Sequence, residues 1–173
     1  MKGLKRTHRC TEVTNKMIGE TVTVMGWTQK RRNLGSLIFV DLRDRSGLLQ
    51  IIFDENSVGV EGFQKAETIR NEFVLAIVGT VQKRSAAVNV QLATGDIEIL
   101  ATQIRVLSES ETPPFPIEEN SQTKEELRLK YRYLDLRRPD LQKILSIRSD
   151  LTTLVRTFLT KEGFLEIETP ILC

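Results

Sequence analysis

The stretch "SLIFVDLRD", residues 36–44, alternates apolar and polar side chains in the manner of a β-strand. Alternate positions of a strand point to opposite faces of a sheet. Ile38, Val40 and Leu42 therefore share one face, which suits the interior of a barrel. Phe39 falls on the other face among charged neighbours, so we expect its ring to point toward water.

Further strand-like segments surround this stretch. One precedes it, three follow it, and apolar residues at helical spacing occur between the third and fourth segments. This order predicts a mainly β domain, a five-stranded OB-fold Greek-key barrel with one helix between strands 3 and 4. The predicted strands are residues 20–32, 36–44, 47–54, 72–84 and 95–110, and the predicted helix is 58–71.

The composition changes after the barrel. The Pro- and Glu-rich residues 108–120 predict a stiff, solvated linker. Thr123 and Glu126 have capping-box spacing, which predicts a helix start, and from Asp140 a helical repeat continues for about six turns to a stop at Gly163. The following "FLEIETPIL" alternates like a strand. We interpret residues 1–108 as the barrel domain, 109–139 as a linker or hinge, and 140–173 as the start of another domain.

The net charge, the cysteine count and the distribution of apolar residues limit the functional classes that are expected. The 173 residues carry a formal net charge of +2, which provides no global argument for nucleic-acid or membrane binding. Cys10 and Cys173 are too few and too far apart for a disulfide framework, so a reducing, cytoplasmic setting is expected. His8 and Cys10 lack nearby partner ligands, so no metal site is expected. No segment approaches a membrane span or an export signal.

Cations and one amide are expected around Phe39. Gln50 interrupts an apolar strand with a side chain that can donate and accept hydrogen bonds. An exposed ring beside cations and an amide can bind an unpaired base, with stacking worth ~1–3 kcal/mol. The cations considered for this patch are Lys30, Arg31, Arg32, Arg43 and Arg45, opposed by Asp41 and Asp44.

An alternative without a binding site stays open. A β-bulge could shift the register and turn Phe39 into the core, which would leave the arginines as a solvated face. Gln50 would then be an ordinary polar residue of an edge strand.

Five segments share one resemblance. They are "GWTQKRRNLGSLIFVDLRDRSGLLQIIF" (26–53), "RNEFVLAIVGTVQKR" (70–84), "ATGDIEIL" (93–100), "EELRLKYRYLDLRRP" (125–139) and "GFLEIETPIL" (163–172). In this order they closely resemble bacterial aspartyl-tRNA synthetases, from the anticodon-binding OB domain into the class II catalytic domain. Lysyl- and asparaginyl-tRNA synthetases share the architecture.

The resemblance implies roles for barrel residues. Phe39 matches the ring that stacks on the middle anticodon uridine, and Arg32 and Gln50 match residues that hydrogen-bond its edge. Glu98 matches a carboxylate that contacts an anticodon base, or else is an ordinary exposed strand residue. Arg84 matches a further basic position, and Lys30 and Arg31 complete the expected site.

The resemblance also implies roles for residues in the second half of the chain. "KYRYLDLRRP" resembles the interdomain hinge, whose basic residues would contact the tRNA body or else pair internally with Glu125, Glu126 and Asp135. "GFLEIETPIL" resembles motif 1, which builds the class II dimer interface. The hinge residues are Lys130, Arg132, Arg137 and Arg138, and the motif 1 residues are Gly163, Phe164 and Pro170.

The resemblance implies a parent enzyme that attaches aspartate to its tRNA through an aspartyl-adenylate, using ATP and magnesium, as a homodimer. Motifs 2 and 3 are absent from these residues, so we expect this piece to hold no cofactor and to be inactive alone. The expected partner is tRNA with an aspartate anticodon. Alternatives are a lysyl- or asparaginyl-tRNA synthetase fragment, a free-standing OB-fold module for single-stranded nucleic acid, or an assembly domain acting through the last helix and strand.

Overall fold

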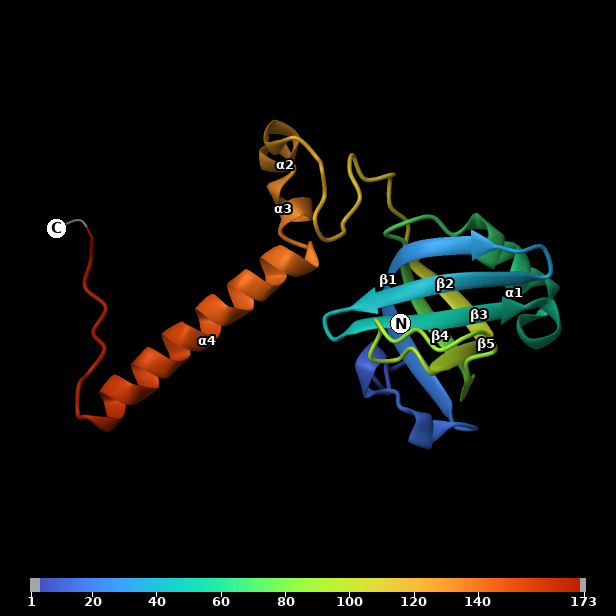
Figure 1. Ribbon diagram of the computed structural model, residues 1–173, viewed down its shortest axis with the longest axis horizontal. Helices are drawn as coiled ribbons and strands as arrows, with labels where there is room; N and C mark the ends of the chain where they lie inside the picture. Colours follow the sequence, from blue (N-terminus) through green and yellow to red (C-terminus); the bar gives the residue numbers. More distant parts are fainter. Residues whose placement is uncertain (1–3, 172–173) are drawn as a thin grey trace. The chain divides into compact units, whose positions relative to one another are not determined.

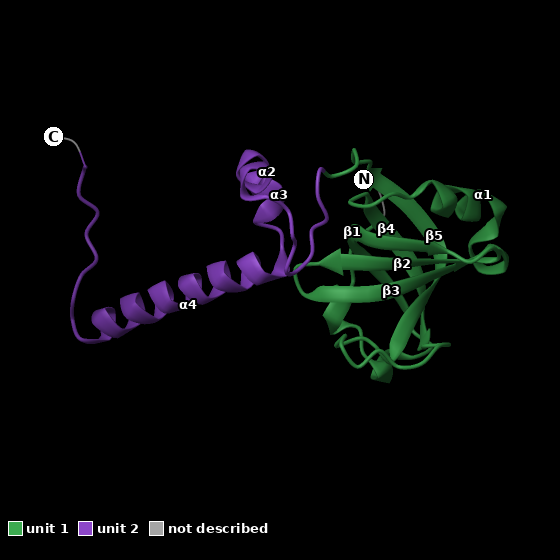
Figure 2. Cartoon of the chain, turned by 45° about the horizontal axis from the view of Figure 1, so that its top comes forward, with its two compact units in different colours: residues 1–113 green, residues 114–173 purple. Residues whose placement is uncertain are grey.

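The computed structural model describes residues 4–171, which divide into two compact units (Figure 2). Unit 1 comprises residues 1–113 and unit 2 comprises residues 114–173. Cys10 is a buried free thiol, and Cys173 lies outside the described residues. Among residues 4–171, no helix has the length and apolar character that a membrane crossing requires.

Unit 1 is a closed barrel with strand order β1-β2-β3-β5-β4 (Figure 1). β3 and β5 pair in parallel, and all other pairs are antiparallel. This arrangement confirms the predicted OB-fold. Its elements are β1 (Thr21–Asn33), β2 (Leu37–Asp44), β3 (Gly47–Asp54), α1 (Glu55–Thr68), β4 (Val74–Lys83) and β5 (Ile97–Ser108).

Strand alternation builds the barrel core. Ile38, Val40 and Leu42 of β2 are fully buried, whereas the residues between them are half-exposed. Each buried methylene contributes roughly 0.8 kcal/mol to the hydrophobic stabilisation of the fold. The face of β2 that carries Phe39 is therefore the outer face, and the alternative in which Phe39 enters the core is wrong.

Helix α1 begins three residues earlier than predicted. The Asp54 side chain accepts a hydrogen bond from the amide of Asn56, which caps the first turn. Gly59 then interrupts the helix with a φ of 75°. Phe63 and Ala66 are buried, and α1 contacts β3 and β5.

A β-bulge in β1 decides which side chains share the face of Phe39. The register between β1 and β2 shifts between Thr28 and Lys30. Thr28 is buried, and simple alternation would turn Lys30 inward as well. The extra residue instead places Lys30 opposite Asp41 and Arg32 opposite Phe39.

The N-terminal segment packs on the turn between β2 and β3. The amide of Cys10, in a 3-10 helix spanning Cys10–Glu12, donates to Asp44 Oδ2 at 2.9 Å. Burial alone would raise the pKa of Asp44, but hydrogen bonds from Ser46 and Cys10 lower it below its ordinary value. Asp44 lies on the inner side of β2, so its assignment to the face of Phe39 is wrong.

Unit 2 contains α2 (Glu125–Lys130), α3 (Arg132–Asp135) and the long α4 (Pro139–Lys161). The predicted long helix is confirmed. Proline occupies its first turn, where a missing amide hydrogen costs nothing. The chain leaves α4 through Gly163, whose φ of 86° favours glycine.

Three local predictions for unit 2 are wrong. The capping box is not formed, because α2 begins after Lys124 and the Thr123 hydroxyl lies 2.7 Å from that of Ser121. The described part of 163–172 contains no strand, since a strand needs a hydrogen-bonded neighbour. The segment predicted to be a solvated linker is partly packed, because its residues Phe115 and Ile117 are buried.

Candidate nucleic-acid interface

Phe39 lies half-buried on the outer face of β2, as predicted. Arg32 is its cross-strand partner in β1. The guanidinium carbon of Arg32 is 5.9 Å from the centroid of the Phe39 ring, close enough for a cation–π interaction. The pair combines a flat apolar surface with a positive charge.

Gln50 connects this pair to two distant strands. Its Oε1 accepts hydrogen bonds from Arg32 Nη2 at 3.2 Å and from Arg84 Nη2 at 2.9 Å. Its Nε2 donates to Glu98 Oε2 at 2.9 Å. β3 lies between β2 and β5, so the alternative that Gln50 belongs to an edge strand is wrong. The structure joins Arg32, Gln50, Arg84 and Glu98 in one network.

Glu98 is completely buried in β5, so the alternative of an ordinary exposed strand residue is wrong. Its Oε1 accepts hydrogen bonds from Gln82 Nε2 and from the amide of Ser85, both at 3.0 Å. Sequence analysis missed Gln82. Its register opposite Glu98 in the β4–β5 pair is set by the tertiary structure, so no local signal in the sequence identifies it.

Arg84 retains unused donors. Its Nε and Nη1 atoms are buried and have no hydrogen-bond partner in the described part of the chain. An unpaired buried donor costs ~1–3 kcal/mol of stability. Both atoms are shielded from solvent, so they are not offered to a ligand in this conformation.

The remaining predicted cations of β1 do not all lie on the face of the barrel that carries Phe39. Lys30 is exposed on the same face as Arg32. Arg31 sits opposite inward-facing Val40 and donates to the Glu67 carbonyl oxygen of α1. The bulge in β1 therefore removes Arg31 from the face of Phe39, and its placement there was wrong.

Arg43 also does not contribute to the cationic patch, because it forms an ion pair with Glu72. Its Nη2 atom lies 2.9 Å from both carboxylate oxygens of Glu72, and both side chains are largely buried. This ion pair neutralises the charge of Arg43. Arg45 is exposed. The positive character of the face of Phe39 thus comes from Lys30, Arg32 and Arg84.

In unit 2, the basic hinge residues converge on a buried carboxylate. Asp135 is fully buried and accepts hydrogen bonds from Arg128 at 2.9 Å, Arg132 at 2.5 Å and Arg138 at 3.1 Å. Burial alone would raise the pKa of Asp135, but hydrogen bonds from Arg128 and Arg138 lower it.

This cluster corrects the hinge prediction. Arg138 is only 4% exposed and also pairs with Asp140 at 2.5 Å, so it is not available to a phosphate. Arg132 is half-exposed but paired with Asp135. The alternative of internal pairing therefore holds for both. Lys130 is exposed beside the Tyr131 ring, and Arg137 is half-buried.

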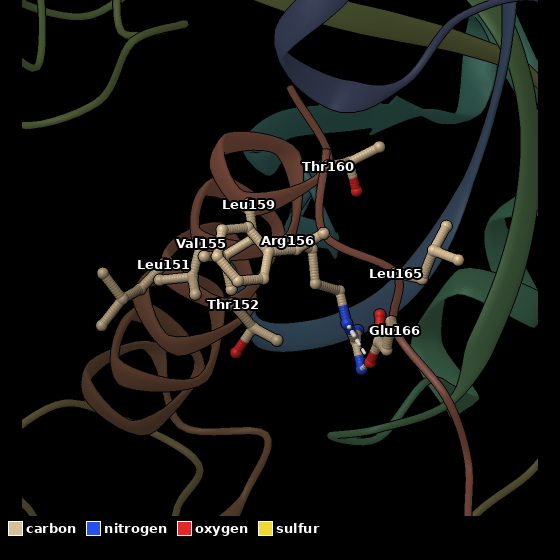
Figure 3. Close-up of a pocket in the computed structure, with 9 residues that line it drawn as sticks. Leu151, Thr152, Val155, Arg156, Leu159, Thr160, Leu165 and Glu166 are labelled. Carbon is tan, nitrogen blue, oxygen red and sulfur yellow. Dashed lines mark hydrogen bonds and ion pairs between the residues drawn. The ribbon is translucent and has the colours of Figure 1, made fainter. Parts of the chain in front are cut away.

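Helix α4 buries none of its side chains. Together with the residues that follow it, α4 lines a cavity of about 480 Å³ that includes Leu151, Val155, Leu159 and Phe164. Figure 3 shows this site and the ion pair between Arg156 and Glu166 that lies beside it. Of the predicted motif 1 residues, Gly163 forms the turn, and Phe164 and Pro170 are exposed.

No group of three His, Cys, Asp or Glu residues suited to a metal ion occurs between residues 4 and 171. The polar network around Gln50 contains the carboxylate of Glu98, whose oxygens are occupied by protein donors, and that of Asp41, which pairs with Arg32. These carboxylates therefore do not fit a magnesium ion, which needs free oxygen ligands.

Comparisons with known families agree with this geometry. Residues 22–107 match the family of OB-fold nucleic acid binding domains. Residues 124–173 match the class II tRNA synthetases of the D, K and N type. The molecule is therefore an OB-fold nucleic-acid-binding domain followed by part of a class II tRNA synthetase.

Individual relatives indicate which class II tRNA synthetase the chain resembles. The chain is 71% identical over 173 residues to an aspartate–tRNA ligase of Agathobacter rectalis. It is 69% identical over 172 residues to an aspartate–tRNA(Asp/Asn) ligase of Lachnoclostridium phytofermentans. The solved aspartyl-tRNA synthetase from Entamoeba histolytica superimposes with a TM-score of 0.89 at 28% identity, with 99% of this chain and 40% of that chain covered.

The chain thus belongs to the aspartyl-tRNA synthetase family. It spans 29% of the length of each of the two bacterial relatives, while 100% and 99% of its own residues are matched.

Proposed function

We propose that unit 1 binds the anticodon of tRNA for aspartate, as part of an aspartate–tRNA ligase. The observation that carries this proposal is the network joining Phe39, Arg32, Gln50 and Arg84 on one face of the barrel. In the parent enzyme, ATP and magnesium would supply the chemistry that activates aspartate. No step of that reaction is assigned to the residues described above.

Each part of the face suits a splayed-out nucleotide. The Phe39 ring offers a stacking surface, and the partly exposed guanidinium of Arg32 can donate to carbonyl oxygens on a base edge. Lys30 and Arg32 attract the flanking phosphates, so binding should weaken as salt rises. Unstacked bases of RNA loops are the usual targets of such a surface.

The test compares Phe39→Ala with the unchanged chain. Fluorescence anisotropy would measure the dissociation constant for a labelled stem-loop bearing the aspartate anticodon GUC. Loss of one stacking interaction should weaken binding by ~1–3 kcal/mol, about 5- to 150-fold. Ile18→Ala is the matched control, because it removes an exposed apolar side chain outside the barrel strands.

Wild-type affinity in the Phe39→Ala chain would reject the anticodon site. An equal loss in the Ile18→Ala chain would also reject it, since the effect would not depend on the stacking ring. Binding to unrelated single-stranded RNA as tight as to the stem-loop would instead favour the free-standing OB module.

A second candidate concerns the range of tRNA bound. One relative carries the name aspartate–tRNA(Asp/Asn) ligase, which favours a parent that also accepts asparagine tRNA. A stem-loop with the asparagine anticodon GUU keeps the middle uridine and changes only the third base. Similar affinities for GUC and GUU would support this broader range.

Further parts of the proposal concern the whole enzyme. Residues 109–139 would form the hinge, with Lys130 and Arg137 beside the tRNA body. The exposed apolar face of α4 would pack within the parent homodimer, with Gly163, Phe164 and Pro170 at that interface. A role in translation would place the enzyme in the cytoplasm.

A further inference from the structure

We infer that Arg138 is a positioning residue, which fastens the segment before α2 to the start of α4 and thereby confines hinge motion of the chain to residues 109–113. The proposed function assigns residues 109–139 to the hinge as a whole. Within this range, we separate a bending part, 109–113, from an anchored part, 114–139. The role of Arg138 refines the proposed hinge and does not depend on the anticodon site.

The guanidinium of Arg138 joins three stretches of unit 2. Its Nε atom donates to the Glu118 carbonyl oxygen at 3.2 Å. Its Nη1 atom donates to Asp135 Oδ1 at 3.1 Å, and its Nη2 atom donates to Asp140 Oδ2 at 2.5 Å. Glu118 precedes α2, Asp135 ends α3, and Asp140 lies in the first turn of α4. One side chain therefore ties these stretches together.

Burial makes this arrangement costly to break. Arg138 is 4% exposed and Asp135 is 0% exposed. A guanidinium only donates hydrogen bonds, and its donors form a rigid planar fork, so each acceptor must keep its place. If Glu118 moved away, a buried charged donor would be left unpaired, which is unfavourable. The backbone at Glu118 is therefore held, although the Glu118 side chain is exposed.

The residues next to Glu118 are packed as well. Phe115 and Ile117 are both buried, and Phe115 lines the same cavity as Leu127 of α2. Burial of apolar side chains is favourable, so it opposes detachment of this segment. Packing and the hydrogen bond from Arg138 thus anchor the chain from Phe115 onward.

Residues 109–113 differ from this anchored part. None of them is buried. The Ser108 hydroxyl donates to the Glu109 carbonyl oxygen at 3.2 Å, and the Ser110 hydroxyl donates to the Glu111 carbonyl oxygen at 2.9 Å. These hydrogen bonds join sequence neighbours and do not fix the course of the chain. A segment with few buried contacts opens at little cost in free energy, so bending is expected here.

Digestion of the full 173-residue chain with the endoproteinase Glu-C tests this division. The bending part contains Glu109 and Glu111, and the anchored part contains Glu118 and Glu119. All of these side chains are exposed, so unequal cleavage would report how firmly the backbone is held. A synthetic peptide of residues 105–123 supplies the intrinsic cleavage rate of each bond. Relative to this peptide, we expect the bonds of the bending part to be cleaved at least about tenfold faster than those of the anchored part.

Substitutions of Arg138 test its own role. Arg138→Met removes the donors, so cleavage of the anchored part should rise to within about threefold of that of the bending part. Arg138→Lys keeps a positive charge beside Asp135 but lacks the planar fork, so it should restore only part of the protection. Arg148→Met is the matched control, because it removes an exposed arginine of α4, and it should leave the cleavage rates unchanged.

Two results would overturn the inference. Equal normalised rates in both parts of the unchanged chain would reject the division of the hinge. Full protection of the anchored part in a folded Arg138→Met chain would reject the role of Arg138. Far-UV circular dichroism shows whether α4 stays helical, and if Arg138→Met loses this helix, full protection in Arg138→Lys would reject the role instead. The anticodon site fails separately, because unchanged RNA binding by Phe39→Ala would reject it without altering these cleavage rates.

Discussion

The Nη2 atom of Arg32 lies 2.9 Å from the Oδ1 atom of Asp41, on the face of the barrel that carries Phe39. The same nitrogen reaches Gln50 at 3.2 Å. In the free protein, Arg32 is thus divided between a carboxylate and an amide. A bound nucleotide must compete with both for the guanidinium.

This competition predicts that Asp41→Asn strengthens RNA binding. The substitution removes a charge that repels phosphate and releases Arg32 from an exposed ion pair, which is worth ~0.2–1 kcal/mol. The affinity for the GUC stem-loop should rise by up to about fivefold. An anisotropy titration at low and high salt measures the change, and an unchanged or lower affinity would contradict it.

Asp135→Ala should destabilise unit 2. The substitution leaves Arg138, which is 4% exposed, without its buried carboxylate partner. Breaking a buried ion pair from one side costs roughly 3–5 kcal/mol. Amide hydrogen exchange of residues 125–138 should accelerate strongly, whereas Glu61→Ala, which breaks an exposed helical pair in unit 1, should leave that exchange unchanged.

The lowered pKa of Asp135 also predicts a pH dependence. The folded-state pKa lies below the unfolded value of about 3.9. The cluster therefore contributes its full stability above about pH 4 and loses it as the pH falls through the folded-state pKa. The protection factors of the α2 and α3 amides, which are corrected for the intrinsic pH dependence of exchange, should fall on acidification. An Asp135→Ala chain that keeps the same acid-dependent loss of protection would disprove the assignment to Asp135.

Cys10 should be unreactive in the folded protein. Burial raises the pKa of its thiol far above the ordinary value, and the nearby Asp44 carboxylate raises it further. Iodoacetamide at neutral pH should modify the Cys10 peptide only after denaturation. Peptide-resolved mass spectrometry separates this residue from Cys173, and rapid modification of Cys10 without denaturant would be the contrary result.

Gly79→Ala should destabilise the barrel by about 1–3 kcal/mol, the usual cost of overpacking. A Cβ atom at this position would lie 2.4 Å from the Leu100 carbonyl oxygen and 2.5 Å from a methyl group of Ile99. Thermal or urea unfolding measures the loss. Thr102→Ala is a suitable control because Thr102 is exposed on β5, and equal stability of the two variants would disprove the steric explanation.

The proposed homodimer interface can be tested at α4. Leu154 is 65% exposed near the middle of this helix, so Leu154→Glu should leave the stability of the isolated chain nearly unchanged. It should abolish any self-association detected by light scattering at high concentration, because a buried charge without a partner opposes assembly. A wild-type chain that stays monomeric would count against association through this face in the chain itself.

Local periodicity was sufficient to predict much of the architecture. The alternation of Ile38, Val40 and Leu42 determined which face of β2 is inside and left Phe39 outside. The helical repeat after Pro139 predicted α4, with Gly163 near its end. These features depend on neighbouring residues, so a single sequence contains the necessary information.

Predictions from local sequence patterns were wrong where the structure depends on contacts with other parts of the chain. Arg31 was placed on the face of Phe39, but a bulge one strand away from Phe39 turns it toward α1. The residues after Gly163 alternate like a strand but have no neighbour to pair with in the described part of the chain. Thr123 and Glu126 have capping-box spacing, yet the helix begins elsewhere.

By itself, then, the order of residues determined the OB-fold and the long helix and predicted an outward ring of Phe39, for which the structure excluded the inward alternative. Only the tertiary structure decided the polar partners, such as Gln50 with Glu98, which are 48 positions apart, and Gln50 with Arg84, which are 34 positions apart. The physical reason is that periodicity assigns a side chain to a face, whereas a hydrogen bond requires two atoms within about 3 Å. That distance depends on barrel closure, strand register and a bulge, which no local stretch of sequence specifies.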